Sequence, residues 1–275
     1  MTRTEDLRSL SAEDLQRHDD LADFAPEEHT YLGRTKTVFR AGTGPAVIVM
    51  TEMPGITYFV ARFARRVRDA GFTVFLPQMF GTPGRPMSTP YMLGSLSRAC
   101  ISREFRAFSS NRSSPITAWL RALAAAVHPD CGGEGVGAIG MCFTGNFALS
   151  LMLEPAVKAP VLSQPSLPLG RAGGMHIAPD ELAEVKERLE REDLVVLGYR
   201  FQNDKLCRAE RFAAYREALG DRFRGRELPD EAGATGAPID PHSVITVHLV
   251  DEEGEPTREA VDEILDFFRE RLESA

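Results

Sequence analysis

The sequence predicts an α/β protein whose central sheet is mostly parallel and flanked by helices. From Thr35 onward, short β-branched or apolar runs alternate with amphipathic segments, a pattern typical of successive strand–helix units. The 275 residues are 43% hydrophobic and 26% charged, which suits a sizeable apolar core inside a soluble globular protein. No internal repeat or low-complexity tract interrupts the pattern, so we expect a single domain over residues 31–275.

The expected strands and helices alternate along this domain. β-branched and apolar residues cluster in short runs at the strands, and apolar residues recur at helical spacing in the helices. The predicted strands cover residues 35–40, 46–50, 73–76, 136–140, 159–162, 194–200 and 222–228. The predicted helices cover residues 59–70, 116–127, 143–153, 179–192, 208–219 and 258–272.

Three stretches depart from this alternation. Residues 1–30 form an acidic, helix-prone lead-in, in which Ser11 and Asp14 have the spacing of a capping box. Residues 81–114 are rich in Pro, Ser, Arg and Gly, so we expect an irregular excursion that shapes a substrate pocket. Residues 225–241 are predicted to form a second loop of this kind.

Charge and hydropathy argue against several classes of partner. The formal net charge of -8 is spread along the chain, so neither nucleic acid nor an anionic membrane surface is an expected partner. No apolar run approaches the roughly 20 residues of a membrane helix, and the first twenty residues do not resemble a signal peptide. We therefore expect a cytoplasmic protein that acts on a small molecule.

The four cysteines do not form a recognisable framework. They lie at positions 100, 131, 142 and 207, without a CxxC pair or histidines at metal-ligand spacing. This scatter predicts neither a zinc site nor a disulfide scaffold. In a reducing compartment each cysteine is by default a small buried apolar residue.

Cys142 is the exception because of its surroundings. The run Gly137-Ala-Ile-Gly-Met-Cys142-Phe-Thr-Gly145 takes a predicted strand directly into a predicted helix. A nucleophile elbow strains its central residue and needs small neighbours where the strand and helix crowd together. The helix N-terminus would also favour a thiolate and a developing oxyanion.

The same residues allow a rival interpretation. The run Gly135-Val-Gly137-Ala-Ile-Gly140 matches the GxGxxG fingerprint of a nucleotide-dependent oxidoreductase. In a dinucleotide site, however, the glycines follow the strand and open the helix. Here the apolar residues between the glycines read as the strand itself, and no clear acid for the ribose follows about 20 residues on.

This elbow resembles that of the dienelactone hydrolase family, whose members have the α/β-hydrolase fold and a Cys, Asp, His triad. The run that ends in Thr-Glu52-Met53-Pro-Gly55 also resembles the E-x-x-G setting of the family, directly after an early strand. The resemblance implies that Glu52 interacts with the resting Cys142 thiol. It also implies backbone oxyanion donors at Met53 and Phe143.

The resemblance further implies an acid after a later strand and a histidine beyond it. Asp204 follows the predicted strand 194–200, although an Asp here could simply cap the next helix. The chain order nucleophile, acid, base leaves His242 and His248 as candidate bases. Pro241-His242-Ser243 resembles the Gly-His-Ser run of the family, whereas residues 244–250 around His248 alternate like a strand.

The resemblance implies covalent hydrolysis of a small ester or lactone through a thioester on Cys142, with no metal and no cofactor. The family holds the carboxylate of dienelactone with an arginine shortly after the histidine, where this chain has Val244 to Val247. Dienelactone itself is therefore not the expected substrate, and Arg103 is a candidate contact for an anionic one. A non-catalytic binding protein with this fold and the nucleotide-dependent oxidoreductase remain the alternatives.

Overall fold

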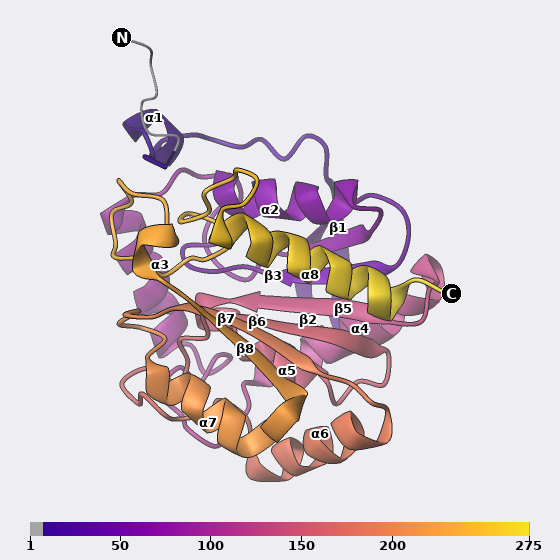
Figure 1. The fold of residues 1–275 in the computed structure, drawn as a ribbon. Helices are drawn as coiled ribbons and strands as arrows, with labels where there is room; N and C mark the ends of the chain where they lie inside the picture. The colour runs from indigo at the N-terminus through magenta and orange to yellow at the C-terminus, as the bar shows by residue number, and fades with distance from the viewer. Residues whose placement is uncertain (1–7, 275) are drawn as a thin grey trace.

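The structure is a computed structural model that describes residues 8–274 (Figure 1). The first seven residues of the predicted lead-in lie outside the described part. Eight strands form one sheet in the order β1-β2-β4-β3-β5-β6-β7-β8. The strands are β1 (Ala25–Tyr31), β2 (Arg34–Ala41), β3 (Ala46–Met50), β4 (Thr73–Pro77), β5 (Val136–Met141), β6 (Val157–Ser163), β7 (Val196–Phe201) and β8 (Phe223–Leu228).

Most of the sheet is parallel, as the sequence predicts. Only the β1–β2 and β2–β4 pairs are antiparallel, and every pair from β4 through β3 to β8 is parallel. All residues of β3, β4, β5 and β7 are buried, because helices cover both faces of the sheet. The carboxyl ends of the parallel strands therefore share one edge, where ligands bind in open α/β sheets.

The helices form a layer on each face of the sheet (Figure 1). On one face α2 and α8 pack in a core with Val47, Ile139 and Phe268, and on the other α4, α5, α6 and α7 pack around Trp119 and Phe212. The helices are α1 (Ala12–Leu15), α2 (Tyr58–Asp69), α3 (Thr89–Ile101), α4 (Pro115–Cys131), α5 (Phe147–Leu151), α6 (Pro179–Arg191), α7 (Ala209–Leu219) and α8 (Pro256–Leu272). Together they make the α/β-hydrolase architecture that the sequence predicts.

The structure corrects three predictions of local structure. The lead-in does contain the predicted capping box at Ser11, but it also supplies β1, which pairs with β2 from Ala25 to Tyr31. The excursion at 81–114 contains a regular helix, α3. Residues 244–248 form a buried turn, and no strand covers residues 244–250. Alternation predicted a strand there, but turns bury these apolar side chains equally well.

No helix among residues 8–274 is long and apolar enough to cross a membrane.

Candidate active site

Cys142 occupies a strained turn at the carboxyl end of β5. Its φ is +53°, in the left-handed region that residues other than glycine rarely adopt. A Cβ at Gly140 would lie 2.2 Å from the Thr144 carbonyl oxygen, and one at Gly145 would lie 2.5 Å from Pro165 Cα. Glycine is therefore required on both sides of the turn, which has the geometry of a nucleophile elbow.

Thr144 holds the turn in place through hydrogen bonds of its side chain. Its buried hydroxyl accepts a hydrogen bond from the Met141 N–H at 3.0 Å and lies 2.9 Å from the Met50 carbonyl oxygen, to which it donates. The elbow is thereby tied to the end of β3, the strand that leads to Glu52. The glycines of the GxGxxG run lie immediately before and within β5, so they do not form the strand-to-helix turn of a dinucleotide site.

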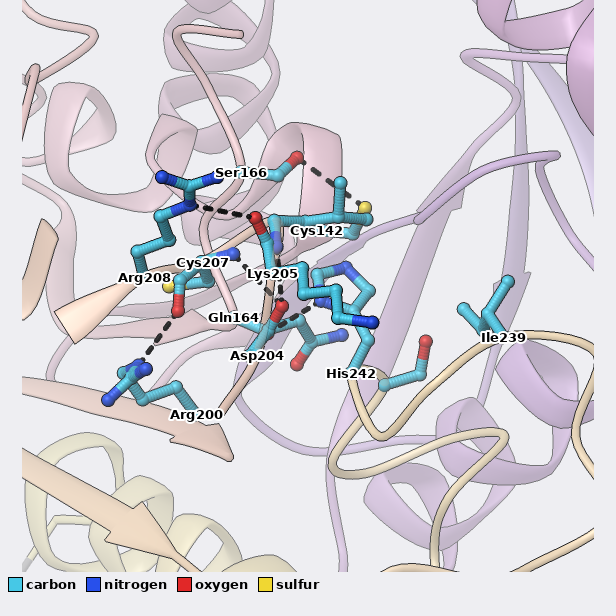
Figure 2. A network of polar contacts seen from close by, with 12 residues as sticks. Cys142, Gln164, Ser166, Arg200, Asp204, Lys205, Cys207, Arg208, Ile239 and His242 are labelled. Atoms are coloured by element: carbon cyan, nitrogen blue, oxygen red, sulfur yellow. Dashed lines mark hydrogen bonds and ion pairs between the residues drawn. The ribbon is translucent and has the colours of Figure 1, made fainter. Parts of the chain in front are cut away.

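Asp204 and His242 form a buried pair next to this turn. His242 Nδ1 lies 2.6 Å from Asp204 Oδ2, and both side chains are almost fully buried. The other carboxylate oxygen, Oδ1, accepts hydrogen bonds from the N–H groups of Leu206 and Cys207. Asp204 thus orders the loop before α7 and holds the imidazole at the same time. Figure 2 shows this pair beside Cys142.

The second nitrogen of His242 does not contact Asp204, and Cys142 lies close to the same ring. Nε2 is buried and has no hydrogen-bond partner among the described residues. Burial disfavours the imidazolium, but the charges of Cys142 and Asp204 outweigh burial and raise the pKa of His242 well above its usual value. These neighbours therefore favour the protonated form of His242.

His248 bonds to the backbone of the loop and not to Asp204. Its Nδ1 accepts a hydrogen bond from the Ser243 N–H at 3.1 Å, and its Nε2 lies 3.3 Å from the Ile239 carbonyl oxygen. Both ring nitrogens are therefore engaged with the backbone of the loop that carries His242. Of the two histidines that sequence order left open, His242 alone contacts Asp204.

Glu52 is buried next to the same loop. Its carboxylate accepts hydrogen bonds from Ser243 Oγ at 2.7 Å, Thr246 Oγ1 at 2.5 Å and Gln164 Nε2 at 3.2 Å. Burial raises the pKa of Glu52, against the lowering effect of these hydrogen bonds. The expected contact with the Cys142 thiol is not among the contacts of the described residues. Glu52 instead anchors Ser243 and Thr246, one and four positions after His242.

A small apolar cavity of about 140 Å³ opens above Cys142. Met53 and Phe143, whose N–H groups are the expected oxyanion donors, both line it. Arg103 does not: it is exposed beyond the end of α3. The segment 81–114 does contribute to the pocket, as the sequence predicts. The cavity is lined by Glu52, Met53, Met87, Met92, Leu93, Leu96, Cys142, Phe143, Ser166, Leu169, Leu206, Ile239, His242 and Ser243.

The sequence did not predict one side chain that contacts Cys142. Ser166 Oγ lies 3.5 Å from Cys142 Sγ, and the Ser166 N–H donates to the Cys142 carbonyl oxygen at 2.9 Å (Figure 2). Ser166 and Gln164 follow β6, the strand next to β5. Their place just beyond a predicted strand, at the edge where Cys142 was expected, is the signal that could have identified them.

Comparisons with known proteins agree with this architecture. The dienelactone hydrolase family matches residues 29–182, more than half of the chain. No curated protein matches the chain.

Solved structures with the same fold include a dienelactone hydrolase-like promiscuous phosphotriesterase from metagenomic libraries, at 17% identity and a TM-score of 0.61, covering 90% of this chain and 98% of that one. A putative dienelactone hydrolase from Klebsiella pneumoniae is 16% identical with a TM-score of 0.58 over the same shares. A dienelactone hydrolase from Anabaena variabilis is 15% identical with a TM-score of 0.54, covering 90% of this chain and 99% of that one. The chain therefore belongs to the dienelactone hydrolase family, and it is a carboxylic ester hydrolase.

Proposed function

We propose that this protein hydrolyses small esters or lactones through a Cys142, His242, Asp204 triad and a thioester intermediate. The observation that carries the proposal is the free Nε2 of His242, which is buried beside Cys142 while Asp204 holds the opposite nitrogen. A base oriented by a carboxylate and directed at a strained nucleophile is the arrangement that covalent acyl transfer needs. A protein that only binds its ligand does not need this arrangement.

Each step of the reaction has an assigned group. Cys142 Sγ attacks the carbonyl carbon, His242 Nε2 takes the thiol proton, and the N–H groups of Met53 and Phe143 stabilise the oxyanion. The tetrahedral intermediate collapses to a thioester when His242 returns this proton to the departing alkoxide. Water then attacks the thioester with His242 as base, which releases the acid and restores the thiol.

Glu52 supports this chemistry through the loop that it anchors. Its bonds to Ser243 and Thr246 fix the backbone on the carboxyl side of His242. The position of the imidazole thus depends on two carboxylates, Asp204 at the ring and Glu52 at the loop. We assign Glu52 a positioning role in the resting enzyme.

The cavity limits the group that lies next to Cys142. Its volume of about 140 Å³ lies below the roughly 300 Å³ of pockets that enclose drug-sized ligands. Met87, Met92 and Leu96 line it, so the group inside is short and apolar. Leu93 and Leu206, at 61% and 51% exposed, border the cavity where it meets solvent.

The proposal is tested by labelling the thiols and following turnover in the same samples. A limiting amount of iodoacetamide is added across a range of pH, the modified cysteine is located by mass spectrometry, and hydrolysis of 4-nitrophenyl acetate is followed. We expect Cys142 to react first and turnover to fall in proportion. Cys100 and Cys131 are internal controls, because both are partly exposed and burial raises the pKa of each. Equal labelling of the three cysteines without turnover would favour the non-catalytic alternative.

A further inference from the structure

A second cleft adjoins the apolar cavity at Cys142 and is lined by cationic side chains. Its volume is about 280 Å³, and four of the ten residues that line it are cationic, whereas none carries a carboxylate. The cations are Arg171 in the loop after β6, Lys205 and Arg208 in the loop after β7, and Arg211 in the first turn of α7. Segments that are far apart in sequence thus place like charges around one space in an acidic protein.

Arg211 gives the strongest indication of a ligand. Its side chain is 1% exposed, and Nη2 donates to the carbonyl oxygens of Pro168 and Arg171 at 3.1 and 2.9 Å. Nε and Nη1 are buried without a hydrogen-bond partner anywhere in residues 8–274. The partners of Arg211 among the described residues are thus backbone carbonyls and not carboxylates, although buried charges are ordinarily paired. A bound anion would offset the cost of burying this guanidinium.

Arg208 and Lys205 are more accessible to a ligand than Arg211. Arg208 is exposed, and its hydrogen bond among the described residues is a long one of 3.4 Å to the Lys205 carbonyl oxygen. Lys205 pairs with Asp240, but both side chains are largely solvent-exposed, at 76% and 65%. Exposed pairs of this kind contribute little and exchange readily. The N-terminus of α7 adds a favourable dipole at the same place.

The cleft and the cavity form one continuous surface around the nucleophile. Ser166, Leu169 and Leu206 line both, and Ser166 Oγ lies 3.5 Å from Cys142 Sγ. Figure 2 shows Ser166 in contact with Cys142, and Lys205 and Arg208 in the surrounding network of polar residues. A substrate whose carbonyl lies at Cys142 can therefore extend past Ser166 into the cationic cleft.

We propose that this cleft binds a carboxylate or phosphate group of the substrate, so that the enzyme prefers anionic esters. The cleft lies on the α7 side of Cys142 and does not use the chain positions after His242, where residues 244–247 carry no positive charge. The inference rests on the proposed function, because it takes Cys142 as the reacting group. Arg211 and Arg208 are assigned as the residues that determine specificity.

Two esters of matched length test the preference. Mono-4-nitrophenyl glutarate has a carboxylate where 4-nitrophenyl valerate has a methyl group, and kcat/KM for each is divided by its rate of base hydrolysis. We expect the anionic-to-neutral ratio to fall on the order of 10-fold in Arg208→Gln and further in Arg211→Gln, as charged hydrogen bonds are lost. Arg216→Gln is the matched control, because Arg216 lies on α7 outside the cleft and pairs with Glu227. An unchanged ratio in Arg208→Gln would overturn the proposal.

A second measurement does not depend on turnover. Anionic 2-sulfonatoethyl methanethiosulfonate and its neutral 2-hydroxyethyl analogue modify thiols, and the ratio of their rates at Cys142 reports the local field. We expect Arg208→Gln to lower this ratio and Arg216→Gln to preserve it. If neither ester is hydrolysed and the reagent ratio still depends on Arg208, the proposed hydrolysis fails and the anion site stands. If both esters are hydrolysed and neither ratio changes, the anion site fails alone.

The same assay separates the two kinds of anion. Inorganic phosphate and glutarate are each added at equal ionic strength during modification by the anionic reagent. Stronger protection by one of them identifies phosphate or carboxylate as the preferred group. No protection by either at concentrations up to tens of millimolar would contradict an anion site.

Discussion

The segment between β8 and α8 carries two buried histidines only six positions apart, His242 and His248. Their surroundings shift the two pKa values in opposite directions. Cys142 and Asp204 face His242 and raise its pKa despite burial. Burial dominates at His248 and lowers its pKa to about 4, because Ile239 and the backbone of the loop are its partners. Burial alone therefore does not decide the charge of a histidine. The charged groups that the fold places next to the imidazole decide whether it is protonated.

The largest expected effect is the difference in esterase activity between variants of His242 and His248. His242→Ala should lower kcat/KM for 4-nitrophenyl acetate by roughly 10⁴-fold, because the nucleophile loses its base. His248→Leu should keep activity within about tenfold of the wild type at 25 °C, since His248 acts only through the loop. Steady-state kinetics on the two purified variants measure both. Similar losses in the two variants would contradict the distinction.

The next effect tests the partner that makes His242 different. Asp204→Asn should lower kcat by roughly 10³- to 10⁴-fold, because an amide cannot stabilise the imidazolium and selects the wrong tautomer. The amide oxygen can still accept the N–H groups of Leu206 and Cys207, so we expect little change in Tm. A large drop in Tm with kcat preserved would show that Asp204 only caps the loop.

A smaller effect concerns stability. His248→Leu leaves the N–H of Ser243 without its acceptor, so the free energy of unfolding should fall by about 1–3 kcal/mol. Urea unfolding followed by fluorescence of Trp119, the single tryptophan, measures this change. The replacement of exposed His18 by Leu is the control, and we expect it to change stability by less than about 0.5 kcal/mol.

The smallest effect is a change in pH dependence. Because the pKa of folded His248 is about 4 against an ordinary 6.5, the unfolded chain takes up a proton that the folded chain refuses. Stability contributed by neutral His248 is thus present above pH 6.5 and lost as pH falls towards 4. His248→Leu should flatten this decline by at most about 1.4 kcal/mol per pH unit. Urea midpoints between pH 4.5 and 7 measure the slope, and an unchanged slope would contradict this origin.

His176 should preserve part of the decline in that variant. Burial lowers its pKa to about 4 as well, so its contribution has the same sign and the same pH window. His176 therefore contributes part of the slope that remains in His248→Leu.

The central strands and the elbow could be predicted because their signals are local. The predicted strand at 46–50 matches β3 residue for residue, and Gly140 and Gly145 mark the turn at Cys142. β1 and α3 were missed for a physical reason. β1 is an edge strand with polar, half-exposed side chains, and α3 begins at Thr89-Pro90 within a run rich in Pro, Ser and Gly, so neither has a strong apolar period.

The site could be predicted only in part. Chain order and short motifs nominated Cys142, Asp204, His242 and Glu52, but no local pattern could show that Glu52 bonds to Ser243 and Thr246. These residues are nearly 200 positions apart in sequence. Their contact depends on how the loop after β8 folds back over the end of β3.

The sequence by itself determined the parallel sheet and the turn at Cys142, because periodicity and glycine spacing act over a few residues. The candidates for the acid and the base came from chain order and from the resemblance to the family. Tertiary structure decided which histidine contacts Asp204 and what Glu52 holds. It also decided that Arg171, Arg208 and Arg211 surround one cleft. The physical reason is that pKa values and binding sites depend on distances through space, which are fixed only when strand ends from distant segments meet at one edge of the sheet.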